Sequence, residues 1–428
     1  MNLFKKLFGW TLSSGDKVKL PANKGSSGQV LGYTDNAGTL GNIAAGGFAV
    51  GDTLTAADSP GSGWCLCDAS IYSQATEAAL YASVGAGASG ENLSSAAYVV
   101  GASNQWSGIC WAPALNLFVA VAVTGTGNRA MTSPDGINWT TRTTPADNSW
   151  GSVCWSPQLA LFVAVAYSGT SNQAMTSPDG INWTIRTTPA GTPQWMSVCW
   201  APALTLFVAV AASGAGSQAM TSPDGINWTI RTTPAGAWNS VCWAPELTLF
   251  VAVSSTNTAT RAMTSPDGIN WTIRATPASN PNFISVCWSP GLRLFAAVAF
   301  SVNGFRVMTS PDGINWTQRL TPADNNWYSV CWAAEMGLFV AVSSSGTGNR
   351  VMTSPDGINW TQRLTPVDNN WYSVCWSPAL MRFVACAGTG TTSRAMTIEN
   401  TYSASTHFEV PLIKPTDLRL KTYIKKTA

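Results

Sequence analysis

Charged side chains are scarce in this chain. Asp, Glu, Lys and Arg make up 10% of the 428 residues, and the formal net charge is +2, whereas a typical soluble domain is roughly 25% charged. Phosphate binding needs clustered Lys and Arg, so the composition argues against nucleic acid as the main partner. The only clusters of basic residues lie near the two ends of the chain, where we interpret them as solvated charge: Lys5, Lys6, Lys414, Arg419, Lys421, Lys425 and Lys426.

Long apolar runs are also missing. No stretch approaches the roughly 18 apolar residues that a membrane-spanning helix needs, so we expect no membrane insertion. The opening residues, MNLFKKLFGW, include Lys5 and Lys6 but have no apolar run behind them. This pattern predicts that the chain carries no secretory signal peptide.

Ten cysteines are present, but their arrangement does not indicate disulfides. Seven of them occupy one position of an internal repeat, and equivalent positions in neighbouring repeats are expected to lie beyond the ~7 Å Cα separation that a disulfide allows. We interpret them as small buried apolar residues. Cys65 and Cys67 form a C-x-C pair, which is a poor metal-binding signature without further ligands. The sequence therefore predicts no metal and no cofactor. The seven repeat cysteines are Cys110, Cys154, Cys199, Cys242, Cys287, Cys331 and Cys375.

Repeats dominate the middle of the chain. The dipeptide Cys-Trp recurs seven times at spacings of 43 to 45 residues. A typical copy reads W-x-S-V-C-W-S-P, then L-x-L-F-V-A-V-A, then a Ser/Gly/Thr loop, then R-A-M-T-S-P-D-G-I-N-W-T-x-R-T-T-P. These are four short β-rich runs separated by Pro, Gly and Asp turn signals, and none has a helical period. Four strands in about 44 residues form one propeller blade, so we predict an all-β, seven-bladed β-propeller.

The incomplete copies at the two ends predict how the ring closes. The seventh copy reads AMTIENTYSA where the others read AMTSPDGINW, and a strand-like segment, Ala96–Ala102, precedes the first copy. We expect this segment to supply the outer strand of the blade that contains Cys375, because closure by both termini leaves no open edge. The predicted divisions are an extended segment at 1–47, a small domain in two parts at 48–94 and 405–428, and the propeller at 95–404.

Six S-P-D-G-I-N-W segments join the expected third and fourth strands of the blades. They resemble the Asp-box of sialidase-like propellers, in a shortened form in which Gly follows Asp directly. We expect Asp to accept backbone N–H bonds across the turn, Gly to allow the tight backbone and Trp to fill the blade. A structural role is therefore predicted for Asp135, Asp179, Asp224, Asp267, Asp312 and Asp356.

The flanks of the repeats carry a second resemblance. The segment Gly63–Gly85, GWCLCDASIYSQATEAALYASVG, resembles the opening of a phage tail-collar domain, with Ala69 where that pattern has Gly. Phe408–Leu412 and Tyr423–Lys425 fit its later F-x-x-P and Y-I-x-K pieces. The segment GSSGQVLGYTDNAGTLG, from Gly25, resembles segments of phage fibre proteins. This resemblance implies a propeller inserted in a collar-like domain, which is an inexpensive insertion because the termini of a propeller meet in one blade.

The resemblances imply a phage fibre or spike protein on the virion surface. Its N-terminal segment would bind other virion proteins, its propeller would recognise a host surface glycan or receptor, and it would form a homo-oligomer, commonly a trimer. A purely architectural virion protein remains the alternative. An enzyme of the sialidase or glycosidase type is less favoured, because an arginine repeated in six blades cannot converge on one substrate and no pair of carboxylates stands out. The one histidine, His407, lies outside the repeats. We therefore predict no catalytic residues.

Differences between the copies suggest where a ligand would bind. The turns between strands one and two, and three and four, hardly vary, whereas the loops on the opposite face differ strongly from copy to copy. An aromatic residue ends each blade-to-blade loop, four residues before the repeat cysteine, and a ring of aromatics can stack on sugars. The alternative is that these aromatics only pack between blades. The predicted ligand-binding residues are Asn148, Trp150, Trp195, Trp238, Asn280, Phe283, Phe305, Asn326, Trp327, Asn370 and Trp371.

Overall fold

The computed structural model describes residues 93–400, except 192, 215, 257–258, 278–280, 302–303 and 391–392, together with six short strands outside that range. The chain forms two compact units, one made of Met1–Gly87 with Tyr402–Ala428 and the other of Ala88–Thr401. The strands of the first unit are β1 (Val30–Tyr33), β2 (Leu40–Ile43), β3 (Thr53–Leu54), β4 (Asp58–Ser59), β5 (Trp64–Leu66) and β34 (Tyr423–Lys425).

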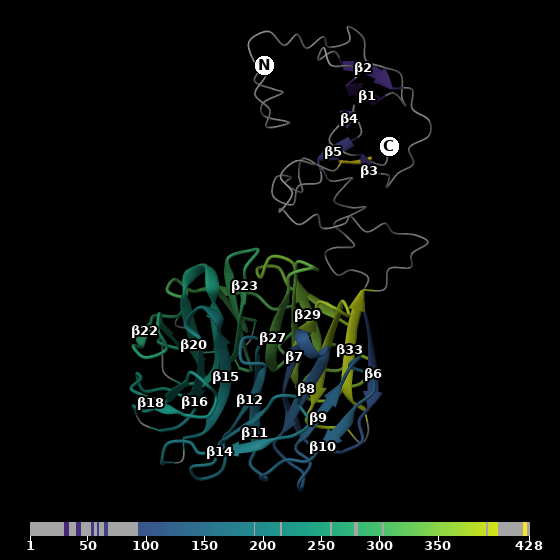
Figure 1. Cartoon of the computed structure of the whole chain (residues 1–428). Coiled ribbons are helices and arrows are strands. Elements are labelled where there is room, and N and C mark those ends of the chain that lie inside the picture. The colour runs from purple at the N-terminus through teal and green to yellow at the C-terminus, as the bar shows by residue number, and fades with distance from the viewer. Residues whose placement is uncertain are drawn as a thin grey trace. The chain divides into compact units, whose positions relative to one another are not determined.

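The larger unit is a seven-bladed β-propeller, as the repeats predict (Figure 1). Each blade is a four-stranded antiparallel sheet. The first strands are β7 (Trp106–Ala112), β11 (Trp150–Ser156), β15 (Trp195–Ala201), β19 (Trp238–Ala244), β23 (Phe283–Ser289), β27 (Trp327–Ala333) and β31 (Trp371–Ser377). The second strands are β8 (Leu117–Ala122), β12 (Leu161–Ala166), β16 (Leu206–Ala211), β20 (Leu249–Ser254), β24 (Leu294–Ala299), β28 (Leu338–Ser343) and β32 (Arg382–Ala387).

The third strands are β9 (Ala130–Ser133), β13 (Ala174–Ser177), β17 (Ala219–Ser222), β21 (Ala262–Ser265), β25 (Val307–Ser310), β29 (Val351–Ser354) and β33 (Ser393–Asn400). The fourth strands are β10 (Thr140–Arg142), β14 (Thr184–Arg186), β18 (Thr229–Arg231), β22 (Thr272–Arg274), β26 (Thr317–Arg319), β30 (Thr361–Arg363) and β6 (Leu93–Val99). Single turns of 3₁₀ helix follow three of the first strands: η2 (Pro113–Leu115), η3 (Pro202–Leu204) and η4 (Pro245–Leu247).

The ring closes through the two ends of the repeat region, which confirms the predicted closure. The outer strand β6 pairs antiparallel with β33 in the blade that contains Cys375. The strand begins and ends three residues earlier than the predicted Ala96–Ala102, because the chain bends at Gly101 and Ala102. In the described residues, the last blade is therefore a complete four-stranded sheet that combines strands from both ends of the repeat region.

The hydrophobic core lies between the blades rather than inside one central mass. Val163 and Val165 of the second blade pack with Trp195 and Phe207 of the third in one buried cluster, and each of the other six blade junctions has an equivalent cluster. Both sides of a blade are thus buried, which explains why the L-F-V-A-V-A runs do not alternate with polar residues. The first strands of neighbouring blades contact one another around the whole ring, so they lie nearest its axis.

A belt of serine hydroxyls joins the first strands of successive blades. Ser285 Oγ accepts a hydrogen bond from the Val330 backbone N–H at 3.2 Å, and the equivalent bond recurs at four other junctions. Gly108 replaces this serine in the first blade, where an added Cβ would lie 2.9 Å from the Gly151 carbonyl oxygen. At this position the first strands of the first and second blades are therefore closer together than a side chain would allow.

The antiparallel strands define two faces of the propeller. The first face, which we call the Asp-box face, holds the turns between strands one and two and between three and four. The second, the loop face, holds the loops between strands two and three and between blades. Strand β33 ends at Asn400, which pairs with Leu93 at the start of β6. The chain thus enters and leaves the propeller on the Asp-box face, where the other six blades have an Asp-box turn.

The smaller unit contains two three-stranded sheets, ordered β2-β1-β4 and β3-β34-β5. In the second sheet, Trp64 pairs with Lys425 and Leu66 with Tyr423. The opening of the collar-like segment and the end of the chain are therefore neighbouring strands, the contact that an inserted propeller requires. Strands β1 and β2 form a hairpin inside the expected extended segment. The predicted boundaries at 47–48 and 404–405 lie outside the described residues.

Candidate functional site

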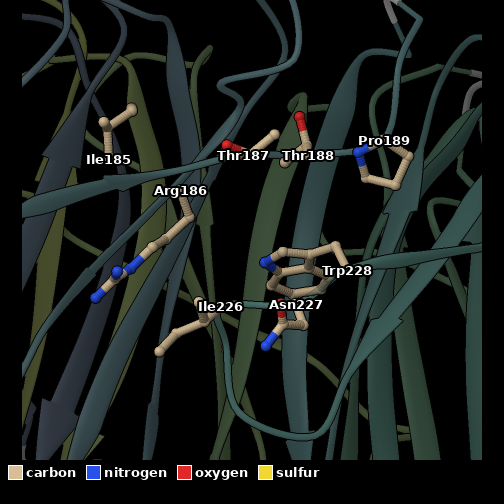
Figure 2. A pocket seen from close by; sticks show the side chains of 8 residues that line it. All are labelled: Ile185, Arg186, Thr187, Thr188, Pro189, Ile226, Asn227 and Trp228. Atoms are coloured by element: carbon tan, nitrogen blue, oxygen red, sulfur yellow. The ribbon is translucent and has the colours of Figure 1, made fainter.

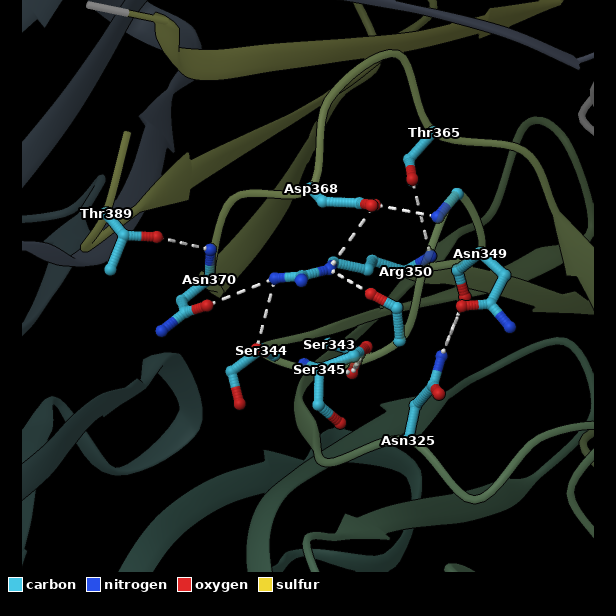
Figure 3. A network of polar contacts seen from close by, with 12 residues as sticks. Asn325, Ser343, Ser344, Ser345, Asn349, Arg350, Thr365, Asp368, Asn370 and Thr389 are labelled. Atoms are coloured by element: carbon cyan, nitrogen blue, oxygen red, sulfur yellow. Dashed lines mark hydrogen bonds and ion pairs between the residues drawn. The ribbon is translucent and has the colours of Figure 1, made fainter. Parts of the chain in front are cut away.

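The loop face carries a ring of long polar side chains, one immediately before the Ala-Met-Thr or Val-Met-Thr run of each third strand. They are Arg129, Gln173, Gln218, Arg261, Arg306, Arg350 and Arg394. Figure 3 shows the arrangement at Arg350, whose Nε donates to the Gly346 carbonyl oxygen at 2.8 Å and lies 3.5 Å from the Asp368 carboxylate. Asp368 also accepts the Gly348 N–H at 2.7 Å. The arginine thus ties the loop between strands two and three to the loop that leads into the next blade.

Two of the predicted asparagines lie beside these arginines. Asn370 Oδ1 accepts a hydrogen bond from Arg350 Nη1 at 3.0 Å, and Asn326 Oδ1 accepts one from Arg306 Nη1 at 2.8 Å. Both side chains are half-buried on the loop face. Because the arginine engages the carbonyl oxygen, each amide group is oriented and its Nδ2 remains a donor for a ligand hydroxyl.

Asn148 has a different role from the one predicted. It is buried, and its Nδ2 donates to the Asn172 carbonyl oxygen at 2.7 Å. Asn325 makes the same bond to the Asn349 carbonyl oxygen at 2.8 Å. Asn148 is therefore equivalent to Asn325 rather than to Asn326, and it braces a loop instead of facing solvent.

The predicted ring of aromatics is buried. Trp150, Trp195, Trp238, Trp327 and Trp371 are 0% exposed, and Phe283 is 1% exposed. Their rings fill the junctions between blades, as the packing alternative proposes. A side chain without exposed surface cannot stack on a sugar in this conformation, so these six residues belong to the core and not to the site.

Two other predicted residues lie at the loops. Phe305 is 40% exposed in the loop before β25, so its ring is available on the loop face. Asn280 lies outside the described residues.

A different set of aromatic rings gathers on the loop face, at the ends of two first strands and one second strand. Phe300, Tyr328 and Tyr372 come from three consecutive blades; the first two stack at 6.0 Å between centroids, and Tyr328 contacts Tyr372 at 5.0 Å. All three are half-buried. Gly388 lies directly against the Tyr372 ring, where any Cβ would collide with it. Burial raises the pKa of Tyr328, so its hydroxyl stays protonated at neutral pH.

A β-bulge explains why the sequence did not reveal the two tyrosines. The register between the first and second strands shifts just after the buried aromatic, for example between Trp327 and Ser329. The residue inside the bulge is unpaired and re-aimed toward the loop face. The copies carry a signal, because the bulge residue varies while its two neighbours are constant apart from Phe283 and Gly108. The bulge residues are Ser107, Gly151, Met196, Asn239, Ile284, Tyr328 and Tyr372.

The six Asp-box turns are built alike. Asp179 Oδ1 accepts the Ile181 and Asn182 N–H groups at 2.8 Å, and its Oδ2 accepts Asn182 Nδ2 at 2.7 Å. Burial, the largest single effect, would raise the pKa of this carboxyl, but these bonds together with one from Ser177 lower it to about 2. Trp183 Nε1 closes the turn by donating to the Gly180 carbonyl oxygen at 3.1 Å. The carboxylate is saturated by its own turn and is not available for chemistry.

An open groove lies on the outer edge between the second and third blades (Figure 2). Its volume is about 450 Å³, and its lining is Ile185, Arg186, Thr187, Thr188 and Pro189 with Ile226, Asn227 and Trp228. Arg186 Nε is bound to Thr176 Oγ1 at 2.8 Å. Trp228 is only 9% exposed, so the groove offers little aromatic surface, and the loop face is the better candidate.

The repeat cysteines are thiols without disulfides in the described part of the chain. Burial is the main cause that raises their pKa, to about 12 for Cys331. They are therefore neutral and unreactive at physiological pH. Between residues 93 and 400, outside the gaps, no cluster of three or more His, Cys, Asp or Glu is placed to hold a metal. None of the helices in the described residues is long and apolar enough to span a membrane.

Comparison with known proteins identifies the fold but no relative in sequence. No family model matches the chain, and no curated protein matches it. The virginiamycin B lyase from Staphylococcus aureus with quinupristin is similar in structure, with a TM-score of 0.62 and 7% identity over 72% of this chain and 99% of that one. A structure of YCF48 bound to the D1 peptide has a TM-score of 0.54 and 16% identity over 73% of this chain and 96% of that one. These likenesses establish the seven-bladed propeller.

Proposed function

We propose that this chain is a phage fibre or spike protein on the virion surface, and that the loop face of its propeller recognises a host surface glycan. The observation that carries the proposal is the opposition of the two faces. The chain enters and leaves through the Asp-box face at Leu93 and Asn400, so the loop face, where the copies differ, points away from both connections.

The chemistry of the loop face suits a sugar ligand. Phe300, Tyr328 and Tyr372 offer ring surface, while Asn326 and Asn370 offer amide donors held by arginines. Sugars are bound by such combinations of aromatic faces and oriented hydrogen-bonding groups. A few half-buried rings bind weakly, so attachment would depend on many copies per particle, where avidity adds roughly 10² to 10⁴.

The virion assignment rests on the flanking segments. The collar-like opening at Gly63–Gly85 and the end of the chain resemble one domain, and β5 and β34, which belong to these two parts, are paired. In this proposal residues 1–47 contact other virion proteins, and the chain assembles as a homo-oligomer, for which the resemblance implies three copies. No step is catalytic. Seven-bladed propellers serve enzymes and binding proteins alike, so the fold does not choose between these roles.

Binding of the full chain to polysaccharides isolated from a panel of bacteria tests the proposal. The informative variant is Tyr328→Ser with Tyr372→Ser, since Ser107 occupies the same repeat position. The matched control is Ile181→Ser with Ile226→Ser on the Asp-box face. We expect at least one polysaccharide to bind, with at least tenfold loss in the tyrosine variant and no loss in the control. Binding lost only in the control variant would overturn the assignment to the loop face. Absence of binding to every polysaccharide tested would favour an architectural virion protein.

A further inference from the structure

The arginines of the loop face differ in how their charge is balanced. Arg129, Arg306 and Arg350 have an aspartate at 3.6, 3.8 and 3.5 Å. The three aspartates, Asp147, Asp324 and Asp368, each precede the buried tryptophan of the next blade by three residues. Where the ring has Gln173 and Gln218 instead, the corresponding residues are Thr192 and Ala235. In these five blades, arginine occurs with a carboxylate and glutamine occurs without one.

Arg394 breaks this pattern. The residue three positions before Trp106 is Ser103, which is exposed. Arg394 is 9% exposed; its Nε donates to the Gly390 carbonyl oxygen at 2.8 Å, and its Nη1 donates to the Gly388 carbonyl oxygen at 3.1 Å and to that of Asn104. Within the described part of the chain no carboxylate lies within ion-pair distance of it. A buried guanidinium bound only to neutral groups retains a full uncompensated charge, which is costly.

Within the loop-face ring, Arg261 likewise has no ion pair among the described residues, but its counterpart, residue 280, lies outside them. Its Nη1 is bound to Asn282 Oδ1 at 2.8 Å. Arg394 is therefore the position where the counterpart residue, Ser103, is described and is not a carboxylate.

The surroundings of Arg394 connect it to the aromatic cluster. Gly388, whose carbonyl oxygen Arg394 binds, lies against the ring of Tyr372. A ligand that covers Tyr372 would thus lie beside the Nη1 end of the guanidinium. Its acidic group would have to reach the Nε side, where three other blades place an aspartate. Asn370 belongs to the same loop face and approaches Arg350 of the preceding blade.

We propose that Ser103, Arg394 and Tyr372 form a subsite for an acidic sugar. The ligand carboxylate or sulfate pairs with Arg394 as Asp368 pairs with Arg350, and the sugar ring covers Tyr372. This deepens the proposed function and rests on it. The subsite selects ligands by charge. An anionic group forms a charge-assisted bond with the guanidinium, whereas a neutral sugar of the same shape leaves the guanidinium charge uncompensated.

The experiment compares glucuronate with glucose on the full chain by saturation-transfer NMR titration at low salt, with inorganic sulfate as a third probe. We expect glucuronate to bind at least tenfold more tightly than glucose, and 0.5 M NaCl to remove the difference. Ser103→Asp supplies the carboxylate within the chain, so it should remove the preference for glucuronate without weakening glucose binding. Arg394→Gln should do the same, and glutamine is already tolerated at this position in two blades. Arg129→Gln is the matched control and should leave the preference unchanged, because Arg129 is paired with Asp147 at 3.6 Å and neither residue belongs to this subsite.

Equal binding of glucuronate and glucose to the unaltered chain would overturn the subsite, and so would a preference that persists in Ser103→Asp. Binding of sulfate but not glucuronate would show a site for free anions and overturn the sugar assignment. Binding of bacterial polysaccharide is measured on the same samples. Polysaccharide binding without a charge preference refutes the subsite alone, whereas absence of polysaccharide binding refutes the proposed function, and the glucuronate titration still decides the subsite.

Discussion

The two faces of the propeller are made by the same repeat under different constraints. On the Asp-box face each turn is held by side chains: Ser177, Asp179 and Asn182 bond to one another and to the backbone, so substitution of any of these three breaks a contact. On the loop face the backbone supplies many of the bonds, such as Thr144 N–H to the Gly127 carbonyl oxygen at 3.0 Å. Backbone bonds do not depend on residue identity, so that face is free to vary between copies without loss of the fold.

The largest difference in the free energy of unfolding is expected between variants at two adjacent residues, Trp327 and Tyr328, at the loop-face end of β27. Trp327→Ala removes a fully buried ring and is expected to lower the free energy of unfolding by about 3–5 kcal/mol. Tyr328→Ala removes the re-aimed bulge residue and is expected to cost about 1 kcal/mol or less. Chemical denaturation of both variants measures the comparison. A similar loss in the two would mean that Tyr328 is part of the core.

A pair of glycines compares the two faces directly. Gly225 in an Asp-box turn has φ +72°, and an added Cβ would lie 2.8 Å from Val163 Cγ2 of the preceding blade. Gly127 in a loop has φ +67° with no atom within 4 Å of such a Cβ. Gly127→Ala is expected to cost about 1 kcal/mol for the left-handed backbone. Gly225→Ala is expected to cost about 1–3 kcal/mol more, because overpacking is added. Equal melting temperatures for the two variants would contradict this account.

The serine belt predicts a smaller effect between blades. Ser285→Ala leaves the Val330 N–H without its acceptor and should cost about 1–2 kcal/mol. Ser344→Ala on the loop face serves as the control and is expected to be nearly neutral. If hydrogen exchange at Val330 is no faster in Ser285→Ala than in the unaltered chain, the bond does not contribute to the junction.

The Asp-box face should also set the acid limit of the fold. The pKa of Asp179 is about 2 in the folded chain, below its ordinary value of 3.8. A lowered folded pKa contributes stability that is present above about pH 4 and is lost as the pH falls toward 2. Asp179→Asn should therefore reduce stability at pH 6 and flatten its decline between pH 4 and 2. Parallel pH curves for variant and parent would show that this carboxylate does not contribute to the acid transition.

Much of the fold follows from the sequence, because the repeat carries it. Seven Cys-Trp copies and a missing Asp-box in the last one were sufficient to predict the blades, their strand order and the closing strand. The site was less accessible. From alternation along an ideal strand alone, one cannot tell whether Trp371 or Tyr372 is buried at the blade junction. The bulge between Trp371 and Ser373 decides this: it leaves Trp371 in the junction and directs Tyr372 to the loop face. Asn148 was matched to the wrong position of the repeat: the run before Trp150 has the same length as the run before Trp327, but Ser149 stands where that run has Asn326.

The central claim is that recognition belongs to the loop face. Hydrogen–deuterium exchange of the full chain, with and without a bound bacterial polysaccharide, tests it most directly. The account predicts slower exchange in the loops at 123–129 and 344–350 and in the segment 368–372, with no change in the Asp-box turns at 178–182 and 223–227. Protection confined to the Asp-box turns, with the loops unchanged, would contradict it.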